Sequence, residues 1–184
     1  MKSDVEPASL REVFESLDVS LKEEPRRRSY ALKVTGPYSG IGPAFDRILT
    51  HCKANGETPV EVFGVFCFDP RWVPERDLVS YACVEVGGEP IPEGEIEVRD
   101  LPQGLVASAV VFGPYGGPKV HEAYRRVHGW LHSGKKYRAL ATAANNSLET
   151  SDREFYPNDP DITEPDKVMT EIKIPIAPLS SPST

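Results

Sequence analysis

Two carboxylates near the end of the sequence have surroundings suited to chemistry, Glu154 in REFYPNDP and Glu171 in TEIKIP. A partly buried carboxylate among aromatic rings is costly to desolvate. Such a residue is useful where a cation arrives to neutralise it and the rings add cation–π attraction. The same surroundings raise the pKa of a carboxyl group, which suits a general acid or base. The alternative is a solvated strand carboxylate that pairs with Arg153 or Lys173.

Other residue types point to no metal, cofactor or covalent chemistry. His128 and His132 have the i, i+4 spacing of a metal pair, but no HExxH motif or third ligand accompanies them. We therefore expect exposed helix histidines. The three cysteines are scattered and odd in number, which indicates reduced thiols. GGP at 116–118 lacks the lysine and the spacing of a phosphate-binding loop, so we expect no metal and no cofactor.

The sequence contains the same pattern twice. TGPYSG at 35–40 and FGPYGG at 112–117 lie 77 positions apart, and a DP turn follows each at 69–70 and 159–160, 90 positions apart. The aromatic residues of the intervening helices, Phe45 and Tyr124, are 79 positions apart. The order strand, GPY turn, helix, strand, DP turn, strand therefore occurs in both halves, which indicates an internal repeat.

This order predicts the fold class. We expect an α+β fold, a pseudo-twofold tandem repeat with a mostly antiparallel sheet, two main helices on one face and a ligand groove between the halves. The expected helices and strands are 43–53 and 120–133, and 29–34, 60–68, 79–86, 95–100, 105–112, 153–156 and 169–176. The first repeat is expected at 26–90 and the second at 95–178. Residues 1–25 form an extension with a short amphipathic helix near 9–17, and 179–184 form a flexible tail.

Alignment of the DP turns shows where the two copies differ. It pairs Gly64 with Glu154, Phe66 with Tyr156, Tyr81 with Glu171, and Cys83 with Lys173. Strand residues two apart share a face, so each half should present one set of side chains to a shared groove. We expect that groove to hold Glu154, Tyr156, Glu171, Lys173, Phe66, Phe68 and Tyr81.

Five further aromatic residues complete the expected binding site. Tyr38 and Tyr115 follow the prolines of the GPY turns and form matched lips of the groove, or else pack over their own turns. Trp72 lies in the loop after the first DP turn, where it is a packing plug or a cover for a ligand. Phe45 and Tyr124 face either the sheet or the groove.

These motifs resemble the GyrI-like family, the bacterial effector-binding domain of multidrug-responsive regulators and stand-alone proteins. The resemblance rests on GPY and DP in each half, EVRDLP before the second unit and TEIKIP at the end, and covers residues 26–178. It implies two SHS2-type modules that bind small, often aromatic or cationic, molecules in the groove between them. It also implies that Glu154, in the family's E-x-Y-x-N-D-P pattern, faces a positively charged ligand. The family often has an aromatic residue where Lys173 stands.

The resemblance implies three functions. The first is a stand-alone small-molecule-binding protein that takes aromatic or lipophilic, and also cationic, compounds beside a central glutamate. The second is a hydrolase of cyclopropane-bearing natural products, in which Glu154 or Glu171 activates water or protonates the leaving carbon. The third is a protein–protein modulator such as a DNA gyrase inhibitor.

The charge and the apolar pattern of the sequence limit the kinds of partner that we expect. The net charge is −7, and the one dense basic run, Arg26–Arg28, is short and follows Glu23 and Glu24, which argues against a nucleic-acid-binding face. The residues before the matched region are too few for a helix-turn-helix module, so we expect no direct binding of nucleic acid. No signal-peptide pattern and no long apolar run is present, so we expect a cytoplasmic protein without a membrane partner.

Overall fold

The structure, a computed structural model, describes residues 19–134, 136–143 and 145–179. The short helix expected near residues 9–17 lies outside the described residues. The two main helices are α2 (Gly42–Ala54) and α3 (Pro118–Gly134), and short 3₁₀ turns are η1 (Tyr38–Ile41) and η2 (Glu75–Asp77). The strands are β1 (Ser20–Glu24), β2 (Arg27–Thr35), β3 (Pro59–Phe66), β4 (Val79–Val86), β5 (Glu97–Leu101), β6 (Gly104–Phe112), β7 (Tyr137–Ala139), β8 (Asp152–Phe155) and β9 (Met169–Pro178).

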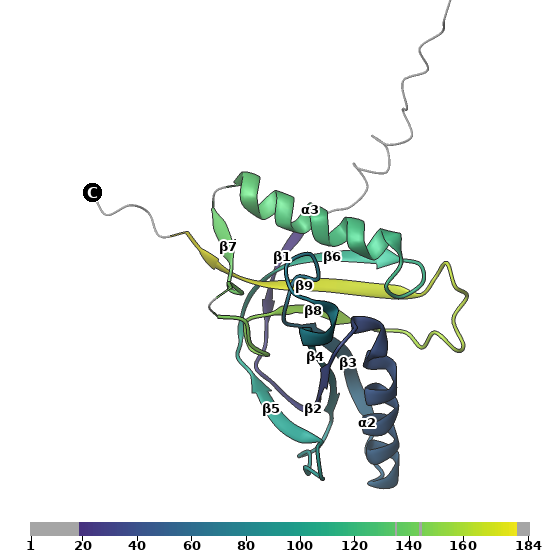
Figure 1. Cartoon of the computed structure of the whole chain (residues 1–184). Helices are drawn as coiled ribbons and strands as arrows, with labels where there is room; N and C mark the ends of the chain where they lie inside the picture. Colours follow the sequence, from purple (N-terminus) through teal and green to yellow (C-terminus); the bar gives the residue numbers. More distant parts are fainter. Residues whose placement is uncertain (1–18, 135, 144, 180–184) are drawn as a thin grey trace, which may run out of the picture.

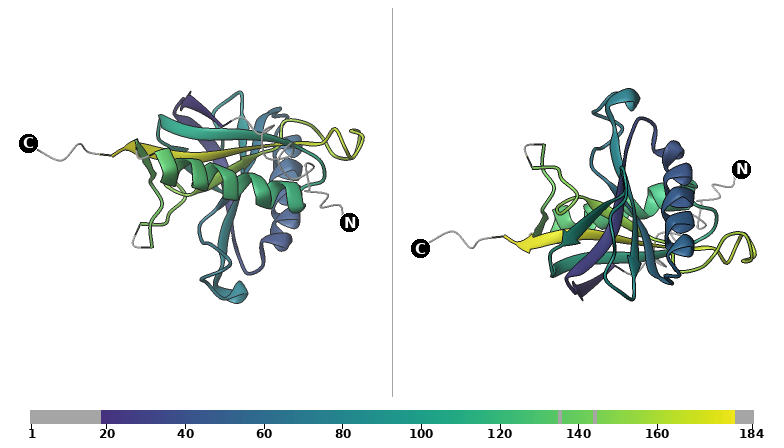
Figure 2. Two further views of the ribbon diagram at one scale, coloured as in Figure 1. Left: turned by 90° about the horizontal axis from the view of Figure 1, so that it is seen from above. Right: turned by 90° about the horizontal axis from the view of Figure 1, so that it is seen from below.

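These strands form one curled antiparallel sheet in the order β1-β6-β9-β8-β3-β4-β2-β5, with β7 beside β9 (Figures 1 and 2). The order has the symmetry that the repeat predicts. The strands β2, β3 and β4 of the first copy correspond to β6, β8 and β9 of the second, and β3 pairs with β8 at the centre. The predicted α+β fold with a pseudo-twofold repeat is therefore confirmed.

The two helices pack on the same face of the sheet, α2 on β2 and β4, and α3 on β6 and β9 (Figure 1). Their buried positions repeat with the 79-residue offset: Ala44, Ile48 and Cys52 of α2 correspond to Ala123, Val127 and Leu131 of α3. This stripe at helical spacing is what a helix needs to cover an apolar sheet face. None of the described helices has the length and apolar character to cross a membrane.

The first and last strands of the sheet are exchanged between the copies. β1 leads into β2 along the chain but pairs with β6, and β5 leads into β6 but pairs with β2. The sequence analysis predicted β5 but no strand at Ser20–Glu24, whose SLKEE lacks the alternation of a half-buried strand because β1 is an exposed edge. The sheet therefore begins before the expected boundary at residue 26. β7 was also not predicted, since three residues carry too little pattern.

The face of the sheet opposite the helices holds a cluster of buried charges. Glu24, at the end of β1, accepts hydrogen bonds from Arg27 of β2 at 3.0 Å and from Lys173 of β9 at 2.7 Å. The Arg27 and Lys173 cations both lie over the ring of Phe155, at 5.0 and 4.0 Å from its centroid. All three charged residues are less than 10% exposed. Glu24 therefore links the exchanged strand to both copies.

We predict that Glu24→Gln destabilises the protein, because it removes the carboxylate that Arg27 and Lys173 share and leaves Arg27 with Glu85 at 2.6 Å and Lys173 with Glu171 at 3.7 Å. Breaking a buried ion pair from one side costs about 3–5 kcal/mol when nothing replaces the lost partner, so we expect a loss at or below the lower end of that range. Urea unfolding followed by circular dichroism measures this loss. The matched control is Glu23→Gln on the same strand, where the side chain is exposed and the change should stay within about 0.5 kcal/mol. Equal effects of the two substitutions would contradict the prediction.

Candidate functional site

The pseudo-twofold axis passes between Gly64 and Glu154. These residues are equivalent in the two copies, and they are also direct partners in the antiparallel β3–β8 pair. Equivalent residues can face each other across such a pair only at the axis itself. A row of cross-strand partners, symmetric about this point, runs Leu32, Ala82, Gly64, Glu154, Ile172 and Ala109. Its other members belong to the cores beneath α2 and α3, so Glu154 lies on the helix-bearing face.

Aromatic rings from both copies fill the space over this pair. A Cβ atom on Gly64 would lie 2.9 Å from Cε2 of Phe66 and 3.3 Å from the hydroxyl of Tyr156. Gly64 is therefore what leaves room for both rings. Phe45 of α2 meets Tyr156 edge-on, with ring centroids 5.7 Å apart. We call Gly64, Glu154 and the surrounding Phe45, Phe66, Tyr124 and Tyr156 the axial site.

Two phenols lie beside the Glu154 carboxylate. The Tyr156 hydroxyl donates a hydrogen bond to Oε2 of Glu154 at 2.9 Å. The Tyr124 hydroxyl of α3 is buried next to the same carboxylate, and burial together with the charge of Glu154 holds its pKa well above the usual value. No partner of good geometry meets the Tyr124 hydroxyl among the described residues. The carboxylate thus accepts one phenol hydrogen bond of good geometry, from Tyr156, and has a second phenol, Tyr124, close beside it.

Burial dominates the electrostatics of Glu154, which is 8% exposed. Burial raises the pKa of its carboxyl group, and the neighbouring phenols of Tyr156 and Tyr124 and the charge of His121 offset this only in part. Neither Arg153 nor Lys173 pairs with Glu154. Arg153 donates to the Glu149 carbonyl at 2.9 Å, and Lys173 binds Glu24 on the opposite face. Within the described part of the chain, Glu154 has no ion-pair partner.

The GPY turns fasten the two ends of the axial site. Gly36 and Gly113 have φ of 121° and 137°, a conformation that favours glycine, and donate to the carbonyls of Leu78 and Val168. The Tyr38 hydroxyl donates to the Phe68 carbonyl at 2.6 Å, and the Tyr115 hydroxyl donates to the Asn158 carbonyl at 2.8 Å. Phe68 and Asn158 are equivalent positions in the two DP turns. Each GPY tyrosine therefore ties its turn to the DP turn of its own copy.

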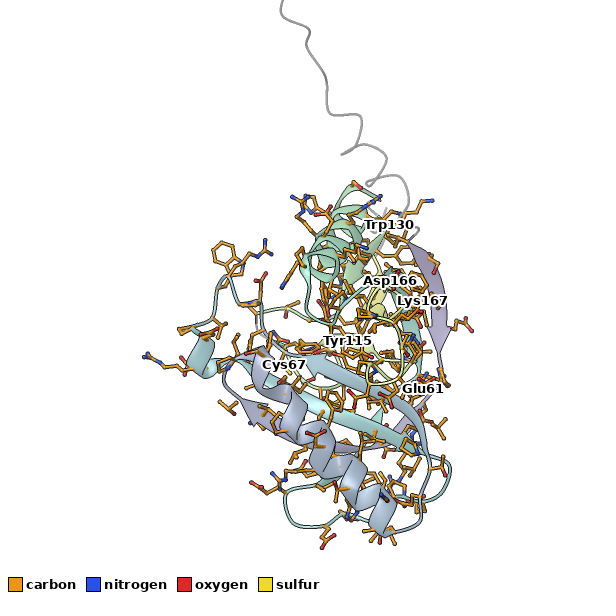
Figure 3. All side chains as sticks on the ribbon, turned by 90° about the vertical axis from the view of Figure 1, so that its right-hand side faces the viewer. Glu61, Cys67, Tyr115, Trp130, Asp166 and Lys167 are labelled. Atoms are coloured by element: carbon orange, nitrogen blue, oxygen red, sulfur yellow. The ribbon has the colours of Figure 1, made fainter. Side chains whose placement is uncertain are left out.

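The rings of these tyrosines extend the aromatic lining. Tyr38 packs against Phe66 and Tyr115 against Tyr156, with centroids 4.9 and 4.7 Å apart. Figure 3 shows Tyr115 between α2 and α3. Burial raises the pKa of Tyr38 to about 12, so this phenol stays a hydrogen-bond donor at neutral pH. Each ring thus lies beside the axial site while its hydroxyl holds the DP turn, and a role as a lip for a ligand stays a prediction.

The expectation that Glu171, Lys173 and Tyr81 share a groove with Glu154 is wrong. On β9 the partner of Glu154 is Ile172, so the neighbouring Glu171 and Lys173 face the other side of the sheet. Glu171 accepts hydrogen bonds there from Lys22 and Ser108. Burial would raise the pKa of its carboxyl group, but these donors outweigh burial and lower it. Alternation within one strand does not fix its register against the next, and the error arose there.

Two other expected aromatic residues also lie outside the axial site. Phe68 packs against the core on the opposite face, with Tyr81. Trp72 is 81% exposed at the tip of the first DP loop, and its equivalent Ile162 is 86% exposed. Neither residue contacts Glu154 in this structure.

A family model of the GyrI-like small molecule binding domain matches residues 17–177. The chain belongs to this family. No curated protein matches the sequence. Among solved structures, the C-terminal domain of EcmrR is similar, with a TM-score of 0.70 and 21% identity over 89% of this chain and 99% of that domain. In the EcmrR–DNA complex, with a TM-score of 0.69 and 21% identity, the match covers 91% of this chain but 62% of EcmrR.

Two more distant neighbours share the GyrI-like fold. SAV2435, solved bound to tetraphenylphosphonium, has a TM-score of 0.54 and 13% identity over 87% of this chain and 94% of that one. A hydrolase encoded by lin2189 from Listeria innocua has a TM-score of 0.56 and 12% identity over 92% of this chain and 97% of that one. At these identities the likeness shows the fold alone.

This GyrI-like domain also contains a contact at the site that the sequence analysis missed. His128 of α3 lies 3.0 Å from the carboxylate of Asp152, two residues before Glu154 on the same strand face. Hydrogen bonding to Asp152 raises the pKa of His128. Alternation along β8 could have placed Asp152 beside Glu154, but nothing in the sequence indicated that His128 reaches it. No group of three or more potential metal ligands occurs among the described residues.

Two shallow hollows lie along α2, and Glu154 lines neither of them. One, of about 670 Å³, lies between α2 and residues 93–96, and its lining includes Arg47 and His51. The other lies between α2 and β2. The axial site is instead filled by its own rings, so a ligand that reached Glu154 would have to displace them.

We predict that Glu154→Gln raises the melting temperature at pH 7–8. Because burial raises the pKa of Glu154 in the folded protein, the folded state binds the proton more tightly than the unfolded state, and stability falls as the pH rises through that pKa. A gain of about 1 kcal/mol would raise the melting temperature by about 2–4 °C. The difference should vanish below about pH 4, where the wild-type carboxyl is protonated in both states.

Differential scanning calorimetry across the pH range checks this prediction. The control is Glu75→Gln in η2, an exposed position where no change is expected at any pH. A lower melting temperature for Glu154→Gln at neutral pH would contradict it.

Proposed function

We propose that this GyrI-like domain binds aromatic, lipophilic cations at the axial site, with Glu154 as the counter-charge. The chain's family is one of small-molecule-binding domains. The proposal assigns the ligand's position and its charge. It rests on the residues that meet at the pseudo-twofold axis.

One observation carries this proposal: Glu154 is a buried carboxylate whose described neighbours include phenols but no ion-pair partner. Glu24, the other buried glutamate, binds two cations. A buried charge without a counter-charge costs folding free energy. A cationic ligand would remove that cost on binding, and the ring faces around Glu154 would add cation–π attraction.

A ligand could reach Glu154 only if the aromatic side chains that cover it moved aside. Phe66 and the Tyr156 hydroxyl occupy the space above Gly64. The Tyr156 phenol would also have to share or release its hydrogen bond with Glu154. Side-chain rotation of this kind needs no change in the paired strands beneath. A neighbour of this fold, SAV2435, binds tetraphenylphosphonium, which makes that cation a suitable first probe.

We predict that the wild-type protein binds members of a panel of aromatic cations that includes tetraphenylphosphonium, and that Glu154→Gln weakens binding about tenfold or more. The reason is loss of a desolvated charge interaction, since each factor of ten is about 1.4 kcal/mol. Isothermal titration calorimetry at neutral pH measures the affinities.

The matched control is Glu171→Gln, which removes a carboxylate from the opposite face of the sheet and should leave the affinity unchanged. Melting curves establish that both variants are folded. Failure of every cation to bind the folded wild-type protein would refute the proposal, and so would equal affinities for the wild type and Glu154→Gln.

A second function, opening of a cyclopropane ring, is favoured by one specific observation. Glu154 has a pKa raised by burial and lies beside two phenols, which is the environment of a general acid. Its carboxyl proton would pass to one ring carbon as the carbon–carbon bond breaks. Water would add to the other carbon and return a proton to the carboxylate. This balances without a cofactor.

For this second function we predict that a cyclopropane-bearing alkylating natural product yields a ring-opened, hydrated product with the wild-type protein, and that Glu154→Gln abolishes the reaction, because the amide cannot donate the proton. Liquid chromatography with mass spectrometry detects the added water. Turnover should persist in Glu171→Gln. Unchanged turnover in Glu154→Gln would exclude Glu154 as the acid.

A further inference from the structure

The two halves of the axial site differ in a consistent direction. At each of three symmetry-related positions, the second copy has a side chain with added oxygen: Gly64 becomes Glu154, Phe66 becomes Tyr156, and Phe45 becomes Tyr124. The first two pairs are fixed by the β3–β8 register. The third follows from the 79-residue offset of the buried positions in α2 and α3. One wall of the site is hydrocarbon and the other is phenolic and acidic.

The tyrosines of the GPY turns do not alter this difference in polarity between the two walls of the site. Tyr38 and Tyr115 are phenols in both copies, but their hydroxyls are bonded to the backbone of their own DP turns. The polar groups left to meet a ligand are therefore the Glu154 carboxylate and the hydroxyls of Tyr124 and Tyr156. All three come from the second copy.

The Tyr124 hydroxyl is the informative member of this group. It is buried against the carboxylate without a hydrogen-bond partner of good geometry among the described residues. Buried hydroxyls are normally satisfied, and one that is not lowers stability. A phenol oxygen can accept a hydrogen bond while its own proton goes to the carboxylate. A ligand N–H group that donates to the Tyr124 oxygen would leave the Tyr124 hydroxyl free to donate to Glu154.

We propose, building on the function proposed above, that the ligand is a protonated aromatic amine whose N–H group donates to the Tyr124 oxygen beside the Glu154 carboxylate while its ring system lies against Phe45 and Phe66. A quaternary ammonium ion offers charge but no donor. It would leave the Tyr124 hydroxyl unsatisfied and hold the carboxylate at a greater distance. The one-sided polarity thus selects for a donor at one end of the ligand and an apolar body at the other.

The test compares two ligands that differ in one methyl group, naphthylmethyl-dimethylamine, which is protonated at pH 7, and naphthylmethyl-trimethylammonium. Titration calorimetry should show that the wild type binds the protonated amine about tenfold tighter or more, the effect of a hydrogen bond to a charged group. Tyr124→Phe should reduce this ratio, chiefly through weaker binding of the amine. Tyr81→Phe is the matched control, because that phenol lies on the opposite face of the sheet, and should leave the ratio unchanged.

Each outcome has a distinct meaning. Equal or tighter binding of the quaternary ion by the wild type overturns this inference while the proposed cation site stands. An unchanged ratio in folded Tyr124→Phe also overturns it. Failure of both ligands to bind the folded wild-type protein, together with failure of the wider cation panel, removes the proposed function itself. The wild-type comparison requires no variant, so the inference is testable whatever the stability of Tyr124→Phe.

Discussion

The pairing of Gly64 with Glu154 across β3 and β8 is the constraint on which the site depends. A repeat folded about a twofold axis brings one residue of each copy together at that axis. Two glutamates there would set like charges directly opposite each other, which is destabilising. The pair here divides the roles: glycine supplies the volume that Phe66 and Tyr156 occupy, and glutamate supplies the charge. The symmetric backbone therefore permits an asymmetric site only because these two positions have diverged.

The two faces of the sheet differ in whether their buried glutamate has an ion-pair partner. Opposite the helices, Glu24 binds Arg27 and Lys173, Glu85 also binds Arg27, and both cations lie over Phe155, so each buried charge in this cluster has an ion-pair partner. On the helix face, the described neighbours of Glu154 include the phenols of Tyr156 and Tyr124 but no ion-pair partner. The exchange of β1 makes the first arrangement available, since it brings Glu24 of the leading strand against β9 of the other copy. The covered cluster stabilises the sheet, and the carboxylate without an ion-pair partner is the group that our proposal assigns to a ligand.

Much of the fold could be predicted because it is repeated. The spacing of the GPY and DP turns is enough to make Gly64 and Glu154 equivalent, and the helices followed from periodic apolar positions. The edge strand β1 could not be predicted, since its pairing with β6 is not encoded in its own alternation. The register between β8 and β9 could not be predicted from the sequence either. It decides that Ile172, not Glu171, lies beside Glu154, and it depends on contacts between strands rather than on either strand alone.

The GPY turns explain why the asymmetry can be confined to side chains. Gly36 and Gly113 make equivalent backbone hydrogen bonds, and Tyr38 and Tyr115 tie both turns to their DP turns. These contacts are alike in the two copies, so they hold the frame at both ends of the axial site. Phe66 and Tyr156 pack against these fixed rings without backbone bonds from their own side chains. Their rotation would require Tyr156 to release Glu154 but no change in these backbone bonds, and chemical divergence at the axis need not disturb the fold that surrounds it.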